Sequence, residues 1–300
     1  MSSILTNNSA MVALQTLKSV NANLSKTQDM ISTGKEIGKA KDNSAIWAIS
    51  KVMESDVSGF EAVSKSLALG ESTVAVASAG AEQITDILKD MKERIVAATG
   101  ENVDHTKIAA EITEMTGQIT DIINGSQFNG ANLLRTDVDG NGASDITVTS
   151  SINRAGPTAV TRTDITVASA DFEANLDLTD IDVSDATNAD ASIALIEAHI
   201  QTAVNGAAAL GASAARIEGQ GEFVSKLTDA MKSGIGALVD ADMEATSARL
   251  QALQVQQQLS TQSLSIANQA PQAILSLFRG ALRAPLTLRP EQPILRKELT

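Results

Sequence analysis

The sequence predicts a mainly α-helical protein, in which the N- and C-terminal segments form a long antiparallel, coiled-coil-like bundle around a small β-rich insertion in the middle. Apolar residues recur every seven positions in both halves of the 300-residue chain, a spacing that keeps one face of a helix against another helix. Aromatic residues make up only 2% of a chain that is 43% hydrophobic, so Ala, Ile, Leu, Val and Met must build its core. Of five prolines only Pro157 precedes the last thirty residues, which permits very long helices.

The first segment, residues 1–45, is predicted to be a helix followed by a loop. Leu17, Leu24 and Ile31 keep the spacing of seven as far as Gly34. Residues 34–43 contain two glycines and dense charge, which is typical of a loop. No basic start followed by an apolar run of sufficient length is present, so we expect no cleaved secretory signal.

Residues 46–130 are predicted to form the N-terminal part of a helical core. Every member of one seven-residue series is apolar: Ile46, Met53, Phe60, Leu67, Val74, Ala81, Leu88 and Ile95. We expect Gly70 and Gly80 to weaken this helix locally, each by about 1 kcal/mol relative to Ala. After a break near Gly100, spacings of four and three predict a second helix that turns back and ends near residues 124–125.

Residues 131–190 change in character and are predicted to be the β-rich insertion. Residues 146–149 and 160–163 alternate as half-exposed strands do, and glycines and Pro157 interrupt them.

The C-terminal half repeats the heptad pattern. Residues 191–240 are predicted to be the C-terminal part of the helical core, with an apolar series of Ile196, Ala203, Leu210, Ile217, Val224, Met231 and Leu238. The small residues 207–212 would let a neighbouring backbone approach closely. Residues 241–279 continue a weaker pattern through Leu250, Leu253 and Leu264, and their glutamines argue against a membrane span.

Local motifs give no support for catalysis, and we predict no enzyme, no cofactor and no metal site. The chain lacks Cys and has only two histidines, His105 in the predicted turn between two helices and His199 among helical residues, and both are expected to be solvated or capping residues. Residues 137–145 match part of a calcium-binding loop, but Val148 stands where a bidentate Glu is required, so we interpret them as a polar turn.

Three further residues have structural interpretations. Asp240 and Asp242 fit helix capping before Met243, and Trp47 fits a packing anchor.

The formal net charge of −13 argues against nucleic-acid and membrane-surface partners.

Several motifs resemble bacterial flagellins, the subunits of flagellar filaments. In the N-terminal part the resemblance rests on residues 4–8, 31–35, 40–43, 48–50 and 127–134. In the C-terminal part it rests on residues 210–212, 239–243, 267–272 and the ending Leu275–Arg279. Trp47 and the short middle are more similar to the small flagellins of alphaproteobacteria.

The resemblance implies a structural protein that polymerises with copies of itself into an extracellular filament for swimming. It implies that residues 1–45 and 241–279 form the inner tube of the filament, with Leu17, Leu24, Ile31, Leu250, Leu253 and Leu264 packing between subunits. It implies that the heptad helices form the next shell and that the insertion faces outward. It also implies export in an unfolded state by the flagellar type III apparatus, with an export chaperone, and contact with junction and cap proteins of the flagellum.

Asp90 lies in the stretch Leu88–Arg94, which resembles the part of flagellins that the animal Toll-like receptor for flagellin contacts. Recognised flagellins usually carry Arg at this position. The opposite charge predicts weak receptor activation.

Residues 280–300, rich in Pro and Arg, have no counterpart in the family. We weigh three interpretations: a tolerated disordered tail, a shifted reading frame or similar artefact, and a specialised minor subunit; we favour the second. Alternatives for the whole chain are a hook–filament junction protein with flagellin-like ends, a membrane-active or adhesive helical protein, and an enzyme with a metal site hidden in the middle.

Overall fold

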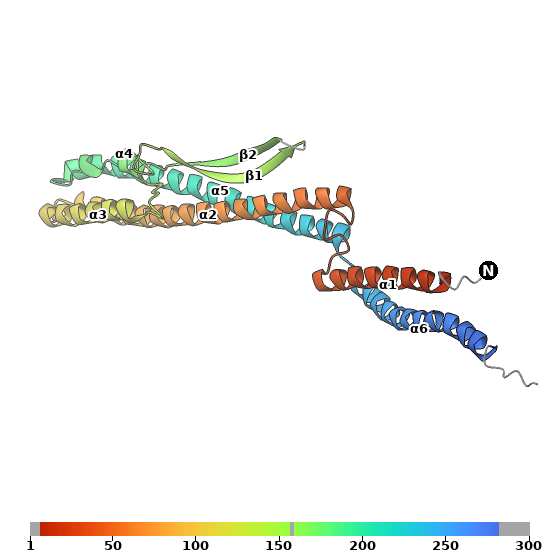
Figure 1. Cartoon of the computed structure of the whole chain (residues 1–300). Helices are drawn as coiled ribbons and strands as arrows, with labels where there is room; N and C mark the ends of the chain where they lie inside the picture. Colours follow the sequence, from red (N-terminus) through yellow and green to blue (C-terminus); the bar gives the residue numbers. More distant parts are fainter. Residues whose placement is uncertain (1–6, 157–158, 282–300) are drawn as a thin grey trace, which may run out of the picture. The chain divides into compact units, whose positions relative to one another are not determined.

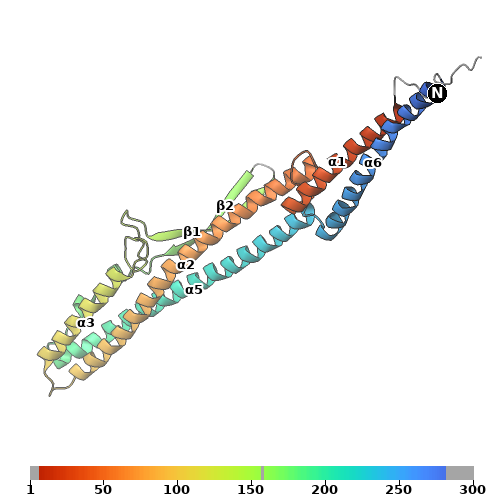
Figure 2. The ribbon, with the colours of Figure 1, turned by 60° about the horizontal axis from the view of Figure 1, so that its bottom comes forward.

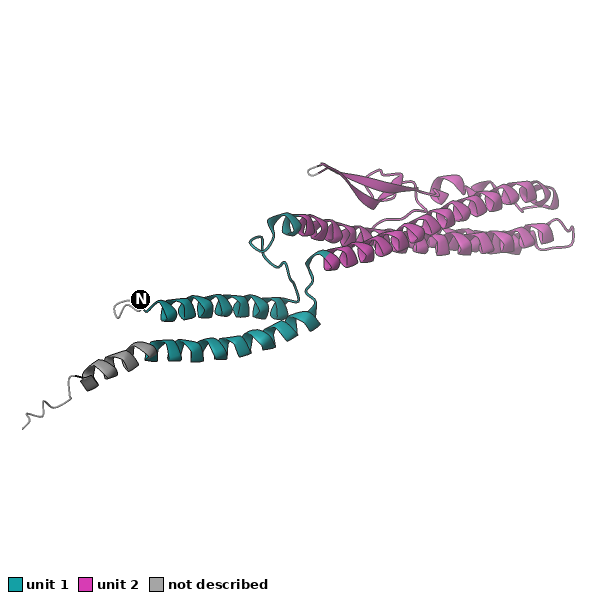
Figure 3. Ribbon diagram, turned by 90° about the vertical axis from the view of Figure 1, so that its right-hand side faces the viewer, with its two compact units in different colours: residues 1–48, 238–300 teal, residues 49–237 magenta. Residues whose placement is uncertain are grey.

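The computed structural model describes the backbone of residues 7–156 and 159–281, and the side chains as far as residue 269 (Figure 1). The chain divides into two compact units (Figure 3). Unit 1 comprises residues 1–48 and 238–300, and unit 2 comprises residues 49–237. The atypical residues 282–300 lie outside the described residues.

Unit 1 is built on two helices, α1 (Asn8–Thr33) and α6 (Met243–Ala281), which lie side by side in Figures 1 and 2. They run antiparallel, because Asn7 Nδ2 donates to Ala267 O at 2.7 Å while Gln257 Nε2 donates to Asn21 Oδ1 at 2.8 Å. Burial follows the seven-residue repeat of a coiled coil, with Val20 and Thr27 buried on α1 and Thr246 and Leu253 buried on α6.

The loop between α1 and α2 pairs with the connection between α5 and α6. α1 ends where Gly34 adopts a φ of 69°, a left-handed conformation that glycine adopts without strain. Glu36 N then donates to Val239 O at 2.8 Å, and Ala241 N donates to Gly34 O at 2.9 Å. These bonds hold the loop and the connection together by their backbones.

Unit 2 contains most of α2 (Ser44–Ala98) and α5 (Ala186–Val239), together with α3 (His105–Gly125). α2 and α5 lie side by side and antiparallel (Figure 2), since Lys232 pairs with Glu61 at 2.7 Å and Lys92 pairs with Glu197 near their other ends. Their heptad residues form one continuous apolar core with α3. The predicted mainly helical fold class, with its small β insertion, is confirmed.

The insertion is a two-stranded antiparallel hairpin of β1 (Asp145–Ala155) and β2 (Ala159–Ala168). A single-turn helix, α4 (Phe172–Asn175), and a short 3-10 helix, η1 (Leu178–Asp180), follow it. The strands are longer than the alternating residues predicted, and neither α4 nor η1 was predicted, because segments of three or four residues are too short to show a period.

The hairpin packs along α2 (Figure 2), and two helical glycines make room for the insertion. A Cβ on Gly70 would lie 2.5 Å from Val148 Cγ2 of the hairpin. One on Gly80 would lie 2.9 Å from Leu134 Cδ1 of the insertion and 2.3 Å from Ser126 Oγ at the end of α3. Their cost to helix propensity is therefore offset by close contacts that a larger residue would prevent.

Two details of the sequence prediction were wrong. Leu238, the last member of the second heptad series, is 41% exposed, and its neighbour Val239 is buried instead. His105 is the first residue of α3 rather than part of the inter-helix turn, and its Nδ1 lies 3.2 Å from Val183 O.

Candidate functional site

The heptad residues of the helical core from Met53 to Met231 lie in unit 2, where most of them belong to one apolar core. Eleven of the fifteen residues of the two heptad series are buried: Phe60, Leu67, Val74, Ala81, Leu88, Ile95, Ile196, Ala203, Leu210, Ile217 and Val224. Met53 and Met231 are half-buried, as is Ile46 at the start of α2. Because the buried members of the two series belong to one apolar core, the chemistry of this seam is that of packing.

The residues predicted to pack between subunits lie on the seam between α1 and α6 of one chain. Leu253 is buried, whereas Leu17, Leu24, Ile31, Leu250 and Leu264 are only half-buried. A two-helix pair covers one side of each such residue, which leaves apolar area that a further surface would bury. Their role between copies stays a prediction.

A second apolar stripe lies on the opposite side of α6, and sequence reasoning missed it. Val255, Leu259 and Ile266 are 55%, 55% and 69% exposed. They repeat with spacings of four and seven residues and point away from the seam, because each lies at least 120° around the helix from Leu253 at about 100° per residue. The signal in the sequence is a second seven-residue repeat of apolar residues, Ala252, Leu259 and Ile266. We call Val255, Leu259 and Ile266 the outer stripe of α6.

The surroundings of the outer stripe are uncharged. No Lys, Arg, Asp or Glu occurs between Arg249 and Arg279. On α1, Met11, Val12 and Leu14 are also exposed, before the first charged residue, Lys18. A helix pair with exposed apolar side chains and no flanking charge presents a surface suited to burial against protein.

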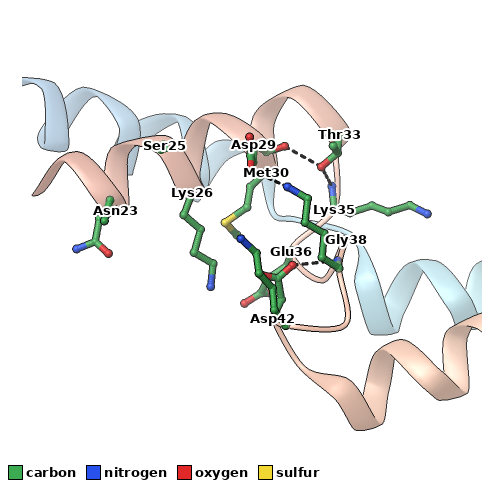
Figure 4. Close-up of a pocket in the computed structure, with 13 residues that line it drawn as sticks. Asn23, Ser25, Lys26, Asp29, Met30, Thr33, Lys35, Glu36, Gly38 and Asp42 are labelled. Atoms are coloured by element: carbon green, nitrogen blue, oxygen red, sulfur yellow. Dashed lines mark hydrogen bonds and ion pairs between the residues drawn. The ribbon is translucent and has the colours of Figure 1, made fainter. Parts of the chain in front are cut away.

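A polar hollow of about 460 Å³ lies in unit 1, where the loop after α1 folds back beside the end of that helix (Figure 4). Four lysines are among its lining residues: Lys26, Lys35, Lys39 and Lys41. Lys39 Nζ pairs with Asp29 at 3.0 Å, and Lys39 N donates to Asp42 Oδ2 at 3.0 Å. We call this feature the lysine hollow.

The loop that resembles a calcium site uses its carboxylates internally. Asp137 Oδ1 accepts from Gly140 N and Gly142 N, at 2.9 and 2.8 Å. Asp139 Oδ1 accepts from Asn141 N and Ala143 N, and these backbone bonds lower the pKa of Asp139. Among the described side chains, those of residues 7–156 and 159–269, no group of three metal-ligating residues comes together. The loop is a polar turn.

The remaining candidates have structural surroundings. Asp242 Oδ1 accepts from Glu244 N and Ala245 N at 3.0 and 3.1 Å and so caps α6, whereas Asp240 pairs by its backbone with Lys35. His199 is half-buried on α5, and Trp47 is half-buried in the first turn of α2, where its N donates to Asn43 O at 3.0 Å.

Asp90 is exposed on α2, and the basic residues around it are occupied. Lys89 pairs with Asp86 at 3.0 Å, Lys92 with Glu197, and Arg94 with Glu111 at 3.5 Å. The local surface therefore offers little unpaired positive charge.

None of the helices, over their described residues, combines the length and apolarity needed to cross a membrane.

Comparison with known proteins gives two family matches. The model of the bacterial flagellin N-terminal helical region matches residues 4–138, and that of the C-terminal helical region matches residues 193–278. The gap between them contains the hairpin, α4 and η1.

Relatives that align over nearly their whole length are flagellins as well. The chain is 42% identical to a flagellin of Brucella melitensis, over 93% of this chain and 100% of that protein. It is 39% identical to flagellin FljM of Caulobacter vibrioides, over 93% and 99%. It is 32% identical to flagellin A of Rhizobium meliloti, over 93% and 100%.

Proposed function

This chain belongs to the bacterial flagellin family and is a structural, non-enzymatic subunit of the flagellar filament, and from that premise we propose how its surfaces take part in assembly. The outer stripe of α6 and the half-buried seam of α1 and α6 are the contacts between copies. The observation that carries this proposal is the 55–69% exposure of three large aliphatic side chains on the stretch of α6 between Arg249 and Arg279, which has no charged residue.

The proposal assigns parts of the chain to layers of the filament. Residues 1–45 and 241–279 line the inner tube, residues 46–130 and 191–240 form the next shell, and residues 131–190 lie outermost. The exposed apolar faces of α1 and α6 support the first assignment, because each is buried only when neighbours surround it.

Folding of α1 and α6 is coupled to assembly. Most apolar residues of their seam are only half-buried, so the isolated pair gains little hydrophobic free energy to offset the entropy of ordering. This weakness also suits passage through the flagellar type III apparatus as an unfolded chain held by an export chaperone, and later contact with junction and cap proteins outside the cell. Loss of the protein from culture medium when the apparatus is disabled would support this route; unchanged secretion would contradict it.

The outer stripe is tested with Leu259→Asp, and Leu259→Met is the matched control. Because Leu259 lies outside unit 2, Leu259→Asp is expected to leave the helix content and the melting temperature of the monomer unchanged, as measured by circular dichroism. A charge on the stripe is expected to abolish filaments in electron micrographs of protein under polymerising conditions, whereas Leu259→Met forms them. Normal filaments from Leu259→Asp would reject the assignment.

We also propose that Asp90 weakens activation of the Toll-like receptor for flagellin. An acidic residue, among lysines and an arginine that already pair with carboxylates, lowers the positive potential of this stretch. Potency in a reporter-cell assay should be well below that of an enterobacterial flagellin and should rise in Asp90→Arg. Equal potency of the unaltered chain would overturn the proposal.

A further inference from the structure

Four asparagines of the chain precede a glycine: Asn124, Asn129, Asn141 and Asn205. Asparagine is among the least stable side chains in warm aqueous solution, because its amide is slowly lost as ammonia. A following glycine favours this loss, since it has no Cβ to hinder its backbone nitrogen and its backbone rotates freely. In an unfolded chain the four sites are therefore nearly equivalent, and the fold decides which of them reacts.

The loss of ammonia follows a ring closure within the chain. The glycine nitrogen gives its proton to hydroxide and forms a bond to the asparagine Cγ. The Cγ–Nδ2 bond breaks, and Nδ2 takes a proton from water and leaves as ammonia. A water molecule then opens the succinimide ring at either carbonyl, which gives aspartate or isoaspartate. Closure requires the glycine nitrogen to turn toward the asparagine side chain by rotation about the Cα–C bond of the asparagine.

Two of the sites lie in helices, which oppose this rotation. Asn205 lies inside α5, where the next N–H donates to a carbonyl four residues earlier in the chain. Gln201 Nε2 also donates to Asn205 Oδ1 at 3.0 Å. Asn124 lies in the last turn of α3, and Ser126 N continues the helical bonds by donating to Ile122 O at 2.9 Å. Rotation at either asparagine breaks helical hydrogen bonds.

The third site forms a tight turn. Phe128 N donates to Ala131 O at 2.9 Å, and Ala131 N donates to Phe128 O at 3.0 Å. Between them Asn129 and Gly130 have φ angles of 50° and 86°, the combination of a type I′ turn. At the ψ of about 30° that this turn requires, the Gly130 nitrogen points away from the Asn129 side chain. Closure would therefore break the turn.

The fourth site, Asn141, lies in the exposed loop before β1, outside the helices and strands. The glycines on either side, Gly140 and Gly142, have φ angles of 77° and 90°, so the backbone rotates there at little steric cost. Gly142 N donates to a side chain, Asp137 Oδ1, at 2.8 Å. Asn141 Nδ2 donates to Asp139 O over 3.3 Å. The two atoms that must meet are thus held by contacts within one exposed loop rather than by a regular element.

We propose that Asn141 is the site at which the folded protein deamidates, and that the fold protects the other three asparagines. The product carries an added negative charge in the insertion, and isoaspartate also lengthens the backbone of the loop by one carbon atom. Because the reaction needs only water, the converted fraction records how long a chain has existed. The inference does not rest on the proposed function, since the monomer itself reacts.

Ageing of the purified full chain tests the assignment. Samples are kept at neutral pH, folded or in urea, and each asparagine is followed by mass spectrometry of peptides and by enzymatic detection of isoaspartate. In urea the four rates should agree within about threefold, because the next residue is the same. In the folded chain Asn141 should stay within about fivefold of its rate in urea, whereas the other three should be slowed at least about tenfold.

Two variants test the loop contacts. Asp137→Ala removes the acceptor of the Gly142 N–H, so Asn141 should convert faster and approach its rate in urea. Asp145→Ala is the matched control, because the carboxylate of Asp145 accepts no hydrogen bond from another described residue, and it should leave the rate unchanged. Melting curves verify that both variants fold.

Each result decides between specific alternatives. Slowing of Asn141 as strong as that of the helical sites, faster conversion at Asn129, or equal rates at all four sites in the folded chain would overturn the assignment. Aspartate without isoaspartate would reject the ring closure, since opening of a succinimide gives both. An unchanged rate in Asp137→Ala would reject the role of the loop contacts. Loss of ammonia that persists undiminished in Asn141→Gln would assign the reaction to another residue.

Discussion

At the scale of single residues, glycines decide where the insertion can dock. A Cβ on Gly206 of α5 would lie 2.4 Å from the ring of Phe172, which is fully buried. Gly211, five residues further along the same helix, would meet no atom within 4 Å. One glycine is therefore required by packing, and the other only lowers helix propensity.

This contrast makes a matched pair of substitutions. Gly206→Ala should destabilise the protein by about 2 kcal/mol, because Phe172 must move. Gly211→Ala should stabilise it by up to about 1 kcal/mol through helix propensity. Urea unfolding followed by circular dichroism measures both; equal effects of the same sign would show that Phe172 does not depend on this contact.

Sequence reasoning could not separate such glycines. Gly70, Gly80, Gly206 and Gly211 all interrupt helical sequence in the same way, and their roles depend on partners far away in the chain. The heptad residues were predictable because their spacing itself encodes which face is buried.

At the scale of elements, the hairpin is attached to α2 by an ion pair as well as by apolar contacts. Arg154 Nε donates to both carboxylate oxygens of Asp56 at 3.0 Å, and their side chains are only 28% and 19% exposed. This hydrogen bonding raises the pKa of Arg154. Gln220 Nε2 adds a bond to Ser150 O at 2.9 Å.

Asp56→Asn should loosen this attachment. Loss of the charge weakens the bond to Arg154, so backbone amides of residues 152–155 and 159–163 should exchange with deuterium several times faster. Asp86→Asn, which removes a pair within α2, is the control and should leave hairpin exchange unchanged. Identical exchange in both variants would mean that the apolar contacts alone hold the hairpin.

The elements were predictable in proportion to their length. Long helices and the hairpin gave clear periods, whereas α4 and η1 depend on the burial of Phe172 and Leu178 by partners distant in sequence. The outer stripe of α6 was missed because Leu250, Leu253 and Leu264 already form an apolar face on that helix, and a second apolar face was not looked for.

At the scale of the whole molecule, paired and turn-forming carboxylates make stability depend on acidity. The pKa of Glu61 is lowered by its hydrogen bond and charge attraction to Lys232, and that of Glu173 mainly by its hydrogen bond to Arg135. The pKa values of Asp139, Asp177 and Asp182 are lowered chiefly by hydrogen bonds from the turns that they close.

Depressed pKa values stabilise the folded state above the ordinary carboxyl pKa of about 4, and the gain disappears as pH falls through the folded values. The melting temperature of the monomer should therefore stay level from about pH 7 to pH 5 and fall below about pH 4. Glu61→Gln should flatten part of that fall. A melting temperature that rises on acidification would contradict this sign.

Trp47 is the single tryptophan of the chain and sits directly after the loop that carries Lys35, Lys39 and Lys41. Its half-buried indole gives the protein a built-in fluorophore, since no tyrosine competes for emission. Near-ultraviolet excitation therefore reports on one place only, the first turn of α2. The kinetics of polymerisation at the start of α2 can therefore be followed in unlabelled protein by the emission wavelength and the anisotropy of Trp47 fluorescence.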